Sequence, residues 1–280
     1  MMSDVRLATI RTPSGTRAVR VDGDEAVELD APDVRSVLER EAWRGWAERA
    51  DGPRHEVASL DLAPLVPSPD KIVCVGLNYR NHILEMGREL PDVPTLFAKY
   101  RSALVGAHDD IVLPAVSEMV DWEAELAVVI GQPVRHVPVD RAHGAIAGYS
   151  VLNDVSARDW QNRTLQWLQG KTFESSTPLG PWLVTPDESP LPHRITCEVG
   201  GELMQDSTTG DLVFDPASLV SFVSTILTLQ PGDVIATGTP GGVGLARTPP
   251  RFLQDGEVVV TAIEGVGELR NTCRRERLPA

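Results

Sequence analysis

The sequence contains few cysteines, and those that it has are far apart. Cys74, Cys197 and Cys273 are the three cysteines of the 280-residue chain. An odd and scattered set provides neither the spacing of a zinc site nor a disulfide framework. We therefore expect a protein of a reducing compartment, the cytoplasm.

Long apolar segments and an excess of basic residues are also missing. The first residues lack the apolar core of a signal peptide, and no stretch reaches the length of a membrane-spanning helix. Lysine and arginine number 26 against 40 aspartates and glutamates, which gives a formal net charge of -14. An acidic surface argues against nucleic acids and anionic membranes as partners. An anionic small molecule would need a local positive centre, such as a metal ion.

Turn-forming residues, by contrast, are plentiful. The chain has 22 prolines and 23 glycines, which favours short strands and many turns over long helices. The hydrophobic fraction of 42% is ordinary for a globular protein. The length fits one large domain, or one large domain with a small appendage.

The pattern divides the chain into a small N-terminal α/β unit, residues 1–66, and a larger domain, residues 67–280. The proline-rich stretch 64–69 reads as the linker. The elements expected in the small unit are a strand at 5–10, a strand at 17–21 with hairpin spacing, and a helix capped by Asp33 that runs through Trp46. Nothing in this unit suggests catalysis.

The stretch 121–131, DWEAELAVVIG, combines a buried strand with paired acids. Leu126 to Ile130 is a short apolar run with β-branched residues, typical of a buried strand. Glu123 and Glu125 are two positions apart, so a strand places both on one face. Two adjacent carboxylates repel each other and resist desolvation, which a bound divalent cation would relieve. The alternative is a pair of solvated acids on an exposed edge.

Asp154 follows the small-residue and apolar strand expected at 143–152. It can cap a following helix, or it can join Glu123 and Glu125 as a third carboxylate. Three carboxylates without histidine or cysteine would form an all-oxygen site. Such a site favours Mg²⁺ or Mn²⁺, with Ca²⁺ next, over zinc.

Two ionisable side chains follow the strand expected at 71–76. His82 and Glu85 are three residues apart and would share a helix face within the segment 77–87. A histidine held by a carboxylate can act as a base toward water, although an exposed surface pair is the alternative. The polar residues that follow suggest a mobile lid. Lys99, at the end of a strand expected at 94–99, can point to solvent or into a site.

The last third of the chain adds a lysine and a glycine-rich loop. Lys171 precedes a strand expected at 178–184, and it would hold a substrate carboxylate or be solvated. Loop 236–244 can bring backbone N–H groups to an anion or be a packed turn, but it lacks the lysine of a P-loop. The remaining elements expected are a hairpin at 195–205 around Gly200 and Gly201, a helix at 214–229, a tight turn into a strand at 230–235, and strands at 258–263 and 267–271.

Six segments in a fixed order carry a family resemblance across roughly residues 67–275. They are VGLNYRNHILEMG, DWEAELAVVIG, LNDVSARDWQ, GKTFE followed by TPLGP, QPGDVIATGTPGGVG and IEGVGELRN. Together they resemble the fumarylacetoacetate hydrolase family. The resemblance implies an α+β fold that is mostly β, a mixed β-sandwich roll, and usually a homodimer. The short N-terminal unit is similar to that of the bacterial members.

The resemblance also implies roles for nine residues. They are Glu123, Glu125 and Asp154 as ligands of Mg²⁺ or Mn²⁺; His82, Glu85 and Lys171 as catalytic residues, with His82 and Glu85 forming a dyad that activates water; and Gln161, Thr239 and Arg158 as substrate-binding residues.

The implied reaction is hydrolysis of a C–C bond in an acylpyruvate-type or fumarylpyruvate-type β-diketo acid through a metal-stabilised enolate. The presence of both His82 and Glu85 favours this reaction. The alternative is an isomerase or decarboxylase of 2-hydroxyhepta-2,4-diene-1,7-dioate or an oxaloacetate-like 2-oxo acid in aromatic catabolism, because GKTFE with TPLGP and the insert 249–253 resemble such members. A non-catalytic fold that binds an oxo acid or a partner protein is disfavoured, because the expected catalytic residues are present.

Overall fold

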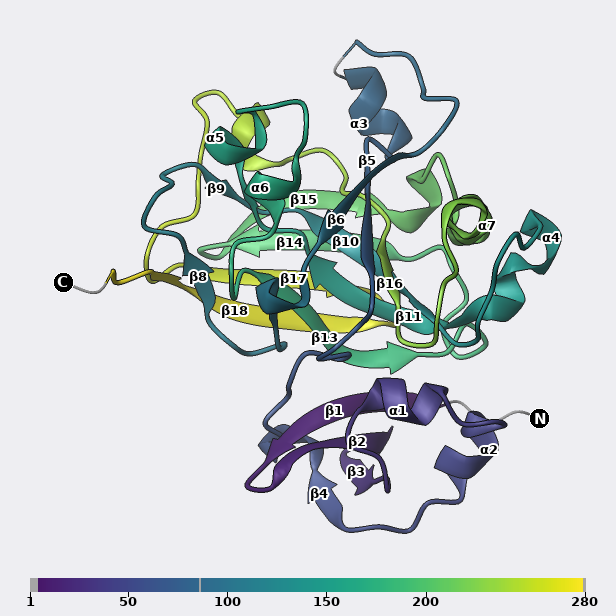
Figure 1. Ribbon diagram of the computed structural model, residues 1–280. Helices are drawn as coiled ribbons and strands as arrows, with labels where there is room; N and C mark the ends of the chain where they lie inside the picture. The colour runs from purple at the N-terminus through teal and green to yellow at the C-terminus, as the bar shows by residue number, and fades with distance from the viewer. Residues whose placement is uncertain (1–4, 86, 279–280) are drawn as a thin grey trace.

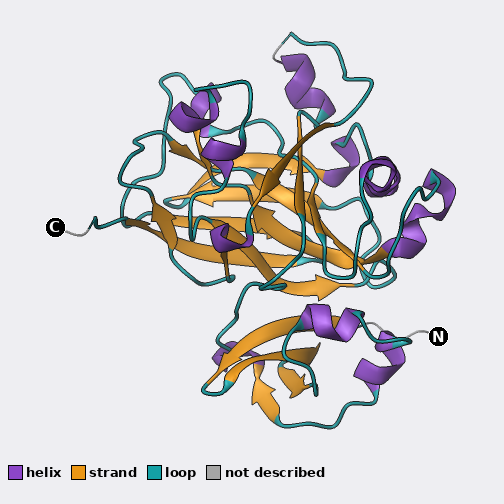
Figure 2. Cartoon of the chain, in the orientation of Figure 1, coloured by secondary structure: helices purple, strands orange, loops and turns teal. Residues whose placement is uncertain are grey.

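Three β-sheets form most of the computed structural model, which describes residues 5–85 and 87–278 (Figure 1). Within these residues the largest sheet has 11 strands in the order β4-β3-β2-β1-β13-β11-β10-β16-β5-β6, with β7 paired to β13. A five-stranded sheet has the order β15-β14-β17-β18-β8, and β12 pairs with β9. Short helices lie around these sheets (Figure 2). The predicted architecture, α+β and mostly β, is confirmed.

The strands are β1 (Arg6–Thr12), β2 (Gly15–Asp22), β3 (Glu25–Glu28), β4 (Arg54–Glu56), β5 (Ile72–Gly76), β6 (Thr95–Lys99), β7 (Leu104–Val105), β8 (Ile111–Leu113), β9 (Val120–Asp121), β10 (Ala124–Ile130), β11 (Ile146–Asn153), β12 (Ser156–Ala157), β13 (Thr177–Val184), β14 (Arg194–Val199), β15 (Glu202–Thr208), β16 (Val234–Ala236), β17 (Val258–Ile263) and β18 (Gly267–Arg275). The α-helices are α1 (Val34–Leu38), α2 (Trp43–Glu48), α3 (Arg80–Glu85), α4 (Val139–Ala142), α5 (Arg158–Gln161), α6 (Leu168–Lys171) and α7 (Pro216–Ile226). Short 3₁₀ segments occur at Val57–Ser59, Arg101–Ala103, His143–Ala145, Thr209–Asp211 and Gly244–Ala246.

Strands β10 and β11 form the centre of the large sheet, and every residue of both is buried. Their apolar and β-branched residues suit a strand covered on both faces. The two strands are antiparallel, and Ala124 pairs with Asn153. The start of β10 therefore lies beside the end of β11, where the predicted acidic residues are.

Strands β5 and β16 are parallel, with Val234 opposite Ile72 and Ala236 opposite Cys74. Because parallel strands end at the same edge of a sheet, the residues after β5 and the glycine-rich loop after β16 leave the sheet side by side. This places the segment of His82 beside the loop of Thr239.

The N-terminal unit forms the predicted β1–β2 hairpin, and β1 also pairs with β13. The single helix expected through Trp46 is wrong. The structure has α1 and α2 instead, separated at Ala42, which has a φ of 52°. Apolar side chains on both sides of this break pack against the same core. The sequence therefore shows one continuous apolar pattern across the break, which is why it suggests a single helix. The Asp33 cap is confirmed by its bond from the Ser36 amide.

Strands β3 and β4 of this unit were not expected. Leu65 and Val66, in the stretch read as a linker, are fully buried. The domain boundary at residues 66 and 67 stays a prediction.

The C-terminal elements follow the sequence closely. Strands β14 and β15 form a hairpin around Gly200 and Gly201, and α7 begins at Pro216 with Asp215 as its N-cap. In the described part of the chain, no helix has the length and apolar character needed to cross a membrane.

Candidate metal centre and active site

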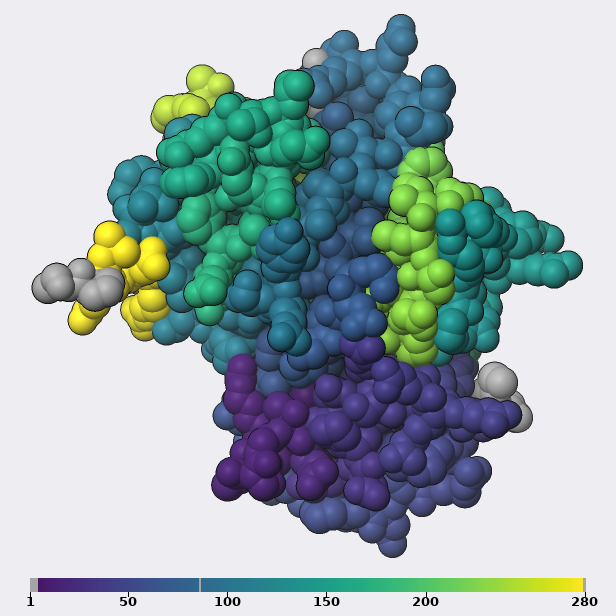
Figure 3. Space-filling view, viewed as in Figure 1, coloured from purple at the N-terminus to yellow at the C-terminus, as the bar shows by residue number. Residues whose placement is uncertain are grey.

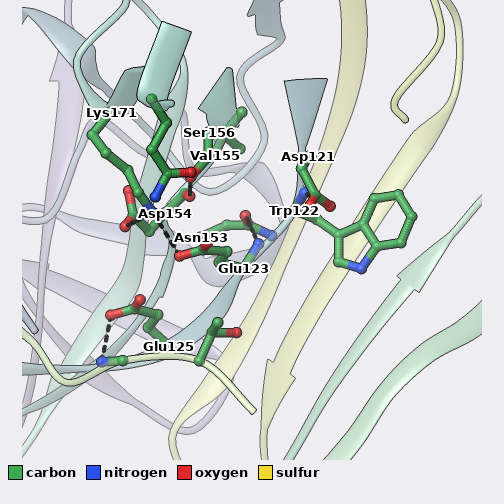
Figure 4. Close-up of polar contacts among 12 residues, drawn as sticks. Asp121, Trp122, Glu123, Glu125, Asn153, Asp154, Val155, Ser156 and Lys171 are labelled. Atoms are coloured by element: carbon green, nitrogen blue, oxygen red, sulfur yellow. Dashed lines mark hydrogen bonds and ion pairs between the residues drawn. The ribbon is translucent and has the colours of Figure 1, made fainter. Parts of the chain in front are cut away.

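Three buried carboxylates meet where β10 begins and β11 ends (Figure 4). The side chains of Glu123, Glu125 and Asp154 each offer an oxygen, and these oxygens all lie within 4.8 Å of one another. The three residues are 7%, 1% and 0% exposed, which excludes solvated acids on an open edge. Asp154 does not cap a helix either, because α5 begins at Arg158 and no side-chain hydrogen bond caps it.

Two lysines enter this cluster from different elements. The Nζ of Lys171 lies 2.7 Å from Glu123 Oε2 and 2.8 Å from Asp154 Oδ2. The Nζ of Lys99 lies 2.6 Å from Asp154 Oδ1. Both lysines are 2% exposed, so neither is a solvated surface residue. Lys99 shares a strand face with Phe97, and this alternation was the available signal for its inward orientation.

The remaining oxygen of Glu123 belongs to a second chain of contacts. Arg158 Nη1 lies 2.7 Å from Glu123 Oε1, and Arg158 Nε lies 2.8 Å from Asp121 Oδ2. Arg158 Nη1 also donates to Gln161 Oε1 at 3.0 Å. Arg158 borders the cavity, as a substrate-binding residue would. Its guanidinium group, however, contacts two carboxylates of the protein itself. Asp121 is fully buried and was missed from the sequence.

The charges in the cluster do not balance. Four carboxylates, those of Glu123, Glu125, Asp154 and Asp121, face three cationic side chains, and one negative charge is left over. Glu125 receives a hydrogen bond from the Gly238 amide at 2.8 Å. Burial, together with Asp154 and Glu123, raises the pKa of Glu125 well above its ordinary value. The described side chains of the cluster therefore carry less positive than negative formal charge.

The pKa of Asp154 shifts in the opposite direction from that of Glu125. Burial acts to raise it, but Lys171 and Lys99 outweigh burial and lower the pKa of Asp154 to about 2.

The three carboxylates form a donor set that fits a hard divalent cation. It offers only oxygen atoms, it is buried, and Glu125 has no cationic partner among the described residues.

A cavity of about 370 Å³ opens beside the carboxylates. Phe97 and Trp167 form an aromatic part of its wall, with their rings edge to face at 5.5 Å. Trp167 lies directly over Gly76, where a Cβ atom would be 2.4 Å from the ring. The predicted site residues that border the cavity are His82, Lys171, Gln161, Arg158, Thr239, Glu123 and Glu125. In the space-filling view, the segment of α5 and α6 lies beside that of α3 and β6 (Figure 3).

The two members of the predicted dyad differ in exposure. His82 is half-buried and borders the cavity, whereas Glu85 is exposed. Both are described, and no hydrogen bond joins them; Met86, in the same predicted segment, lies outside the described residues. Burial lowers the pKa of His82 below 6.5, against the opposing effects of Glu85 and Glu123. The imidazole is therefore neutral at neutral pH and can accept a proton.

The glycine-rich loop is fixed by an amide side chain that was missed from the sequence. Gln205 on β15 donates to Thr239 Oγ1 at 2.8 Å, and its Oε1 accepts from the Ala124 amide at 2.9 Å. The anion that the loop's Gly238 N–H holds is Glu125 of the protein itself. Thr239 remains on the cavity wall, where the predicted substrate contact can occur.

Replacement of Gly241 by alanine is expected to slow the reaction about tenfold without weakening metal binding. The new Cβ would lie 3.2 Å from Glu85 Oε2 and 3.3 Å from His82 Nδ1, so His82 must shift, and small displacements of a reacting group are costly. Gly144→Ala is the control, because its Cβ would meet only Gln132 Nε2 at 3.9 Å. Steady-state kinetics and Mn²⁺ titration measure both effects. Unchanged kcat in Gly241→Ala would contradict a role for His82 in this position.

Comparison with known proteins agrees with this geometry. The family model described as fumarylacetoacetate (FAA) hydrolase C-terminal matches residues 71–274. The chain belongs to the fumarylacetoacetate hydrolase family. The match includes all nine predicted site residues, whose individual roles stay predictions.

The similar proteins include some with isomerase names. Oxaloacetate tautomerase FAHD2B, mitochondrial, of Bos taurus is 50% identical over 223 residues, which are 78% of this chain and 70% of that protein. A putative HpcE protein from Mycobacterium smegmatis superposes with a TM-score of 0.88 at 36% identity, covering 97% of this chain and 100% of the other. A 2-hydroxyhepta-2,4-diene-1,7-dioate isomerase from Mycobacterium marinum superposes with a TM-score of 0.82 at 33% identity, covering 98% and 100%.

Proposed function

We propose that the protein is a divalent-metal-dependent isomerase that interconverts the enol and keto forms of a 2-oxo acid. The observation that carries this proposal is the pairing, in one cavity, of a buried ammonium group with a neutral imidazole. The names of the bovine relative and the M. marinum structure support isomerisation over hydrolysis of a C–C bond. The order of the two readings made from the sequence is therefore reversed.

Lys171 is suited to hold negative charge and unsuited to accept a proton. Burial acts to lower its pKa, but Asp154 and Glu123 outweigh burial, so the pKa of Lys171 is raised. Its ammonium group therefore stays charged. In the proposed reaction it stabilises the negative charge that develops on the substrate oxygen as the enolate forms.

His82 is the proposed proton carrier. Its imidazole is neutral because burial lowers its pKa, and it borders the same cavity as Lys171. It would take the proton from the carbon next to the ketone and give it to the oxygen of the resulting enolate, and the reverse transfer would regenerate the keto form. Thr239 and Gln161 would hold the substrate carboxylate and the oxygen atoms beside it, as the resemblance implies.

Glu123, Glu125 and Asp154 would hold the metal ion, which we propose to be Mg²⁺ or Mn²⁺ because the donors are all oxygen atoms. When bound, such an ion supplies Lewis acidity that lowers the pKa of the proton beside the ketone. It would also reverse the negative charge of the cluster, which favours an anionic substrate in a protein whose net charge is -14.

Hydrolysis needs a base that activates water, and the structure gives this role little support. Glu85 is exposed and makes no hydrogen bond to His82 among the described residues. Enol–keto conversion requires only that His82 move a proton. The hydrolase remains the second candidate because both residues of the predicted dyad are present in the sequence.

Two variants separate these reactions. His82→Ala is expected to reduce isomerisation by about 10²–10⁴-fold, the usual contribution of a general base. Glu85→Gln should stay within about fivefold of the native rate, because an exposed carboxylate interacts weakly. The native rate should decline on acidification only below the ordinary histidine pKa of 6.5. Rates are followed by the ultraviolet absorbance of enol-oxaloacetate.

The hydrolase reading predicts a different pattern for the same variants. Pyruvate would be released from acetylpyruvate or fumarylpyruvate, and Glu85→Gln would lose as much activity as His82→Ala. Either result would contradict the proposed isomerase. Release of CO₂ from oxaloacetate would instead identify a decarboxylase.

Three broader expectations from the sequence are part of the proposal. They are a homodimeric assembly, a location in the cytoplasm and a place in aromatic catabolism. The bovine relative's name places that protein in mitochondria, and gel filtration with light scattering would test the assembly.

A further inference from the structure

We propose that Asp121 is a positioning residue that ties the metal side of the cavity to the loop on its substrate side. The inference rests on the proposed metal-dependent function and concerns a residue for which the family resemblance implied no role. Asp121 is fully buried at the end of β9 and pairs with Ser156 on β12. Ser156 precedes Arg158 by two residues.

All contacts to the Asp121 carboxylate come from donors. Its Oδ1 accepts from the Gly244 amide at 2.7 Å and from the Trp122 amide at 2.9 Å. Its Oδ2 accepts from Arg158 Nε at 2.8 Å and from the Leu245 amide at 3.0 Å. Both oxygens are thus fully used, and only an ionised carboxylate can accept on both sides. An asparagine would place an NH₂ group against one set of donors.

One oxygen of Asp121 is connected to the predicted metal site through Arg158. Arg158 holds Asp121 with Nε and Glu123 with Nη1, at 2.8 and 2.7 Å. A planar guanidinium can satisfy two carboxylates at once with fixed geometry. Asp121 therefore determines the position from which Arg158 holds a predicted metal ligand. Partners of this kind typically change metal affinity by about 10–100-fold.

The two loop amides that donate to Asp121 belong to a segment that forms part of the cavity wall. Gly244 and Leu245 belong to the loop whose residues Val243, Leu245 and Ala246 line the cavity. At Gly244 a Cβ would lie 2.8 Å from Asp121 Oδ1 and 1.9 Å from the Arg251 carbonyl oxygen, so a glycine is needed for this close approach. The carboxylate that orients Glu123 through Arg158 thus also fixes part of the substrate wall.

The test compares Asp121→Asn with Asp233→Asn. Asp233 is also fully buried, and it accepts from the Lys71 and Gln230 amides at 2.9 and 2.7 Å and from Lys71 Nζ at 2.8 Å. It lies just before β16, at the opposite end of that strand from Gly238. Both variants should lower the melting temperature. Only Asp121→Asn should weaken Mn²⁺ binding by about 10–100-fold, raise the KM, and speed hydrogen exchange at Gly244 and Leu245.

A second variant keeps the test decisive if Asp121→Asn folds poorly. Arg158→Lys removes the fixed geometry in which Nε holds Asp121 and Nη1 holds Glu123, so it should reproduce the loss of Mn²⁺ affinity while the loop amides stay protected. Native Mn²⁺ affinity in both Asp121→Asn and Arg158→Lys, with melting temperatures like that of Asp233→Asn, would reduce Asp121 to a structural residue. Absence of Mn²⁺ binding by the native protein would instead overturn the proposed function, and this inference with it.

Discussion

Glu125→Gln is expected to abolish turnover and, at the same time, to raise the melting temperature of the metal-free protein. Glu125 is 1% exposed, and burial with two neighbouring carboxylates raises its pKa. A carboxyl pKa that is raised in the folded state means that stability falls as pH rises from the ordinary value towards the raised one, because the unfolded chain ionises first. The amide removes this charge and still accepts from the Gly238 amide.

The same change should weaken binding of Mg²⁺ or Mn²⁺ by at least about 100-fold, since even residues that only support metal ligands contribute 10–100-fold. Glu28→Gln is the control. It removes one negative charge from the N-terminal unit, where Glu28 pairs with His55 at 2.8 Å. Calorimetric metal titration and thermal unfolding in EDTA measure the two effects. A Glu125→Gln protein that is less stable than native in EDTA, or that binds metal normally, would contradict the site.

Lys171→Met is expected to lower kcat by about 10²–10³-fold, the range found when one preorganised donor to a developing oxyanion is removed. It should also destabilise the metal-free protein by about 3–5 kcal/mol, because a broken buried ion pair leaves its partners uncompensated. The partners are Glu123 and Asp154, at 2.7 and 2.8 Å.

The stability effect of Lys171→Met has a defined pH dependence. The folded-state pKa of Lys171 is raised, so its contribution is fully present below the unfolded pKa of about 10.4 and is lost only as pH rises through the folded value. Lys71→Met is the control, because Lys71 pairs with buried Asp233 at 2.8 Å outside the cavity. Urea unfolding at several pH values and steady-state kinetics provide the readings. Equal losses in the two variants would remove any special role for Lys171.

The residues of the carboxylate cluster could be predicted because their positions relative to two apolar strands are visible in the sequence. Glu123 and Glu125 occupy alternate positions at the start of a buried strand, and Asp154 directly follows a second apolar strand. The family resemblance supplied the grouping of these three residues as metal ligands. Neither pattern could show that β10 and β11 are neighbours, because strand order depends on contacts between distant residues.

The contacts missed from the sequence are those made by side chains from unrelated segments. Asp121 belongs to a two-residue strand, and Gln205 lies on a hairpin across the cavity. Neither residue stands out by spacing or composition. The dyad of His82 and Glu85 stays a prediction. Positions three apart on a helix predict proximity, and the exposure of Glu85 depends on how α3 packs against the loop at Gly241.

The most direct test of the account is the rate of enol-to-keto conversion of oxaloacetate, measured on EDTA-treated protein during titration with Mg²⁺ or Mn²⁺. We expect a rate at the uncatalysed background in EDTA, a saturable rise with metal, and no rise in Glu125→Gln. An equal rate with and without metal, or release of pyruvate from an acylpyruvate without acceleration of the enol–keto conversion, would contradict it.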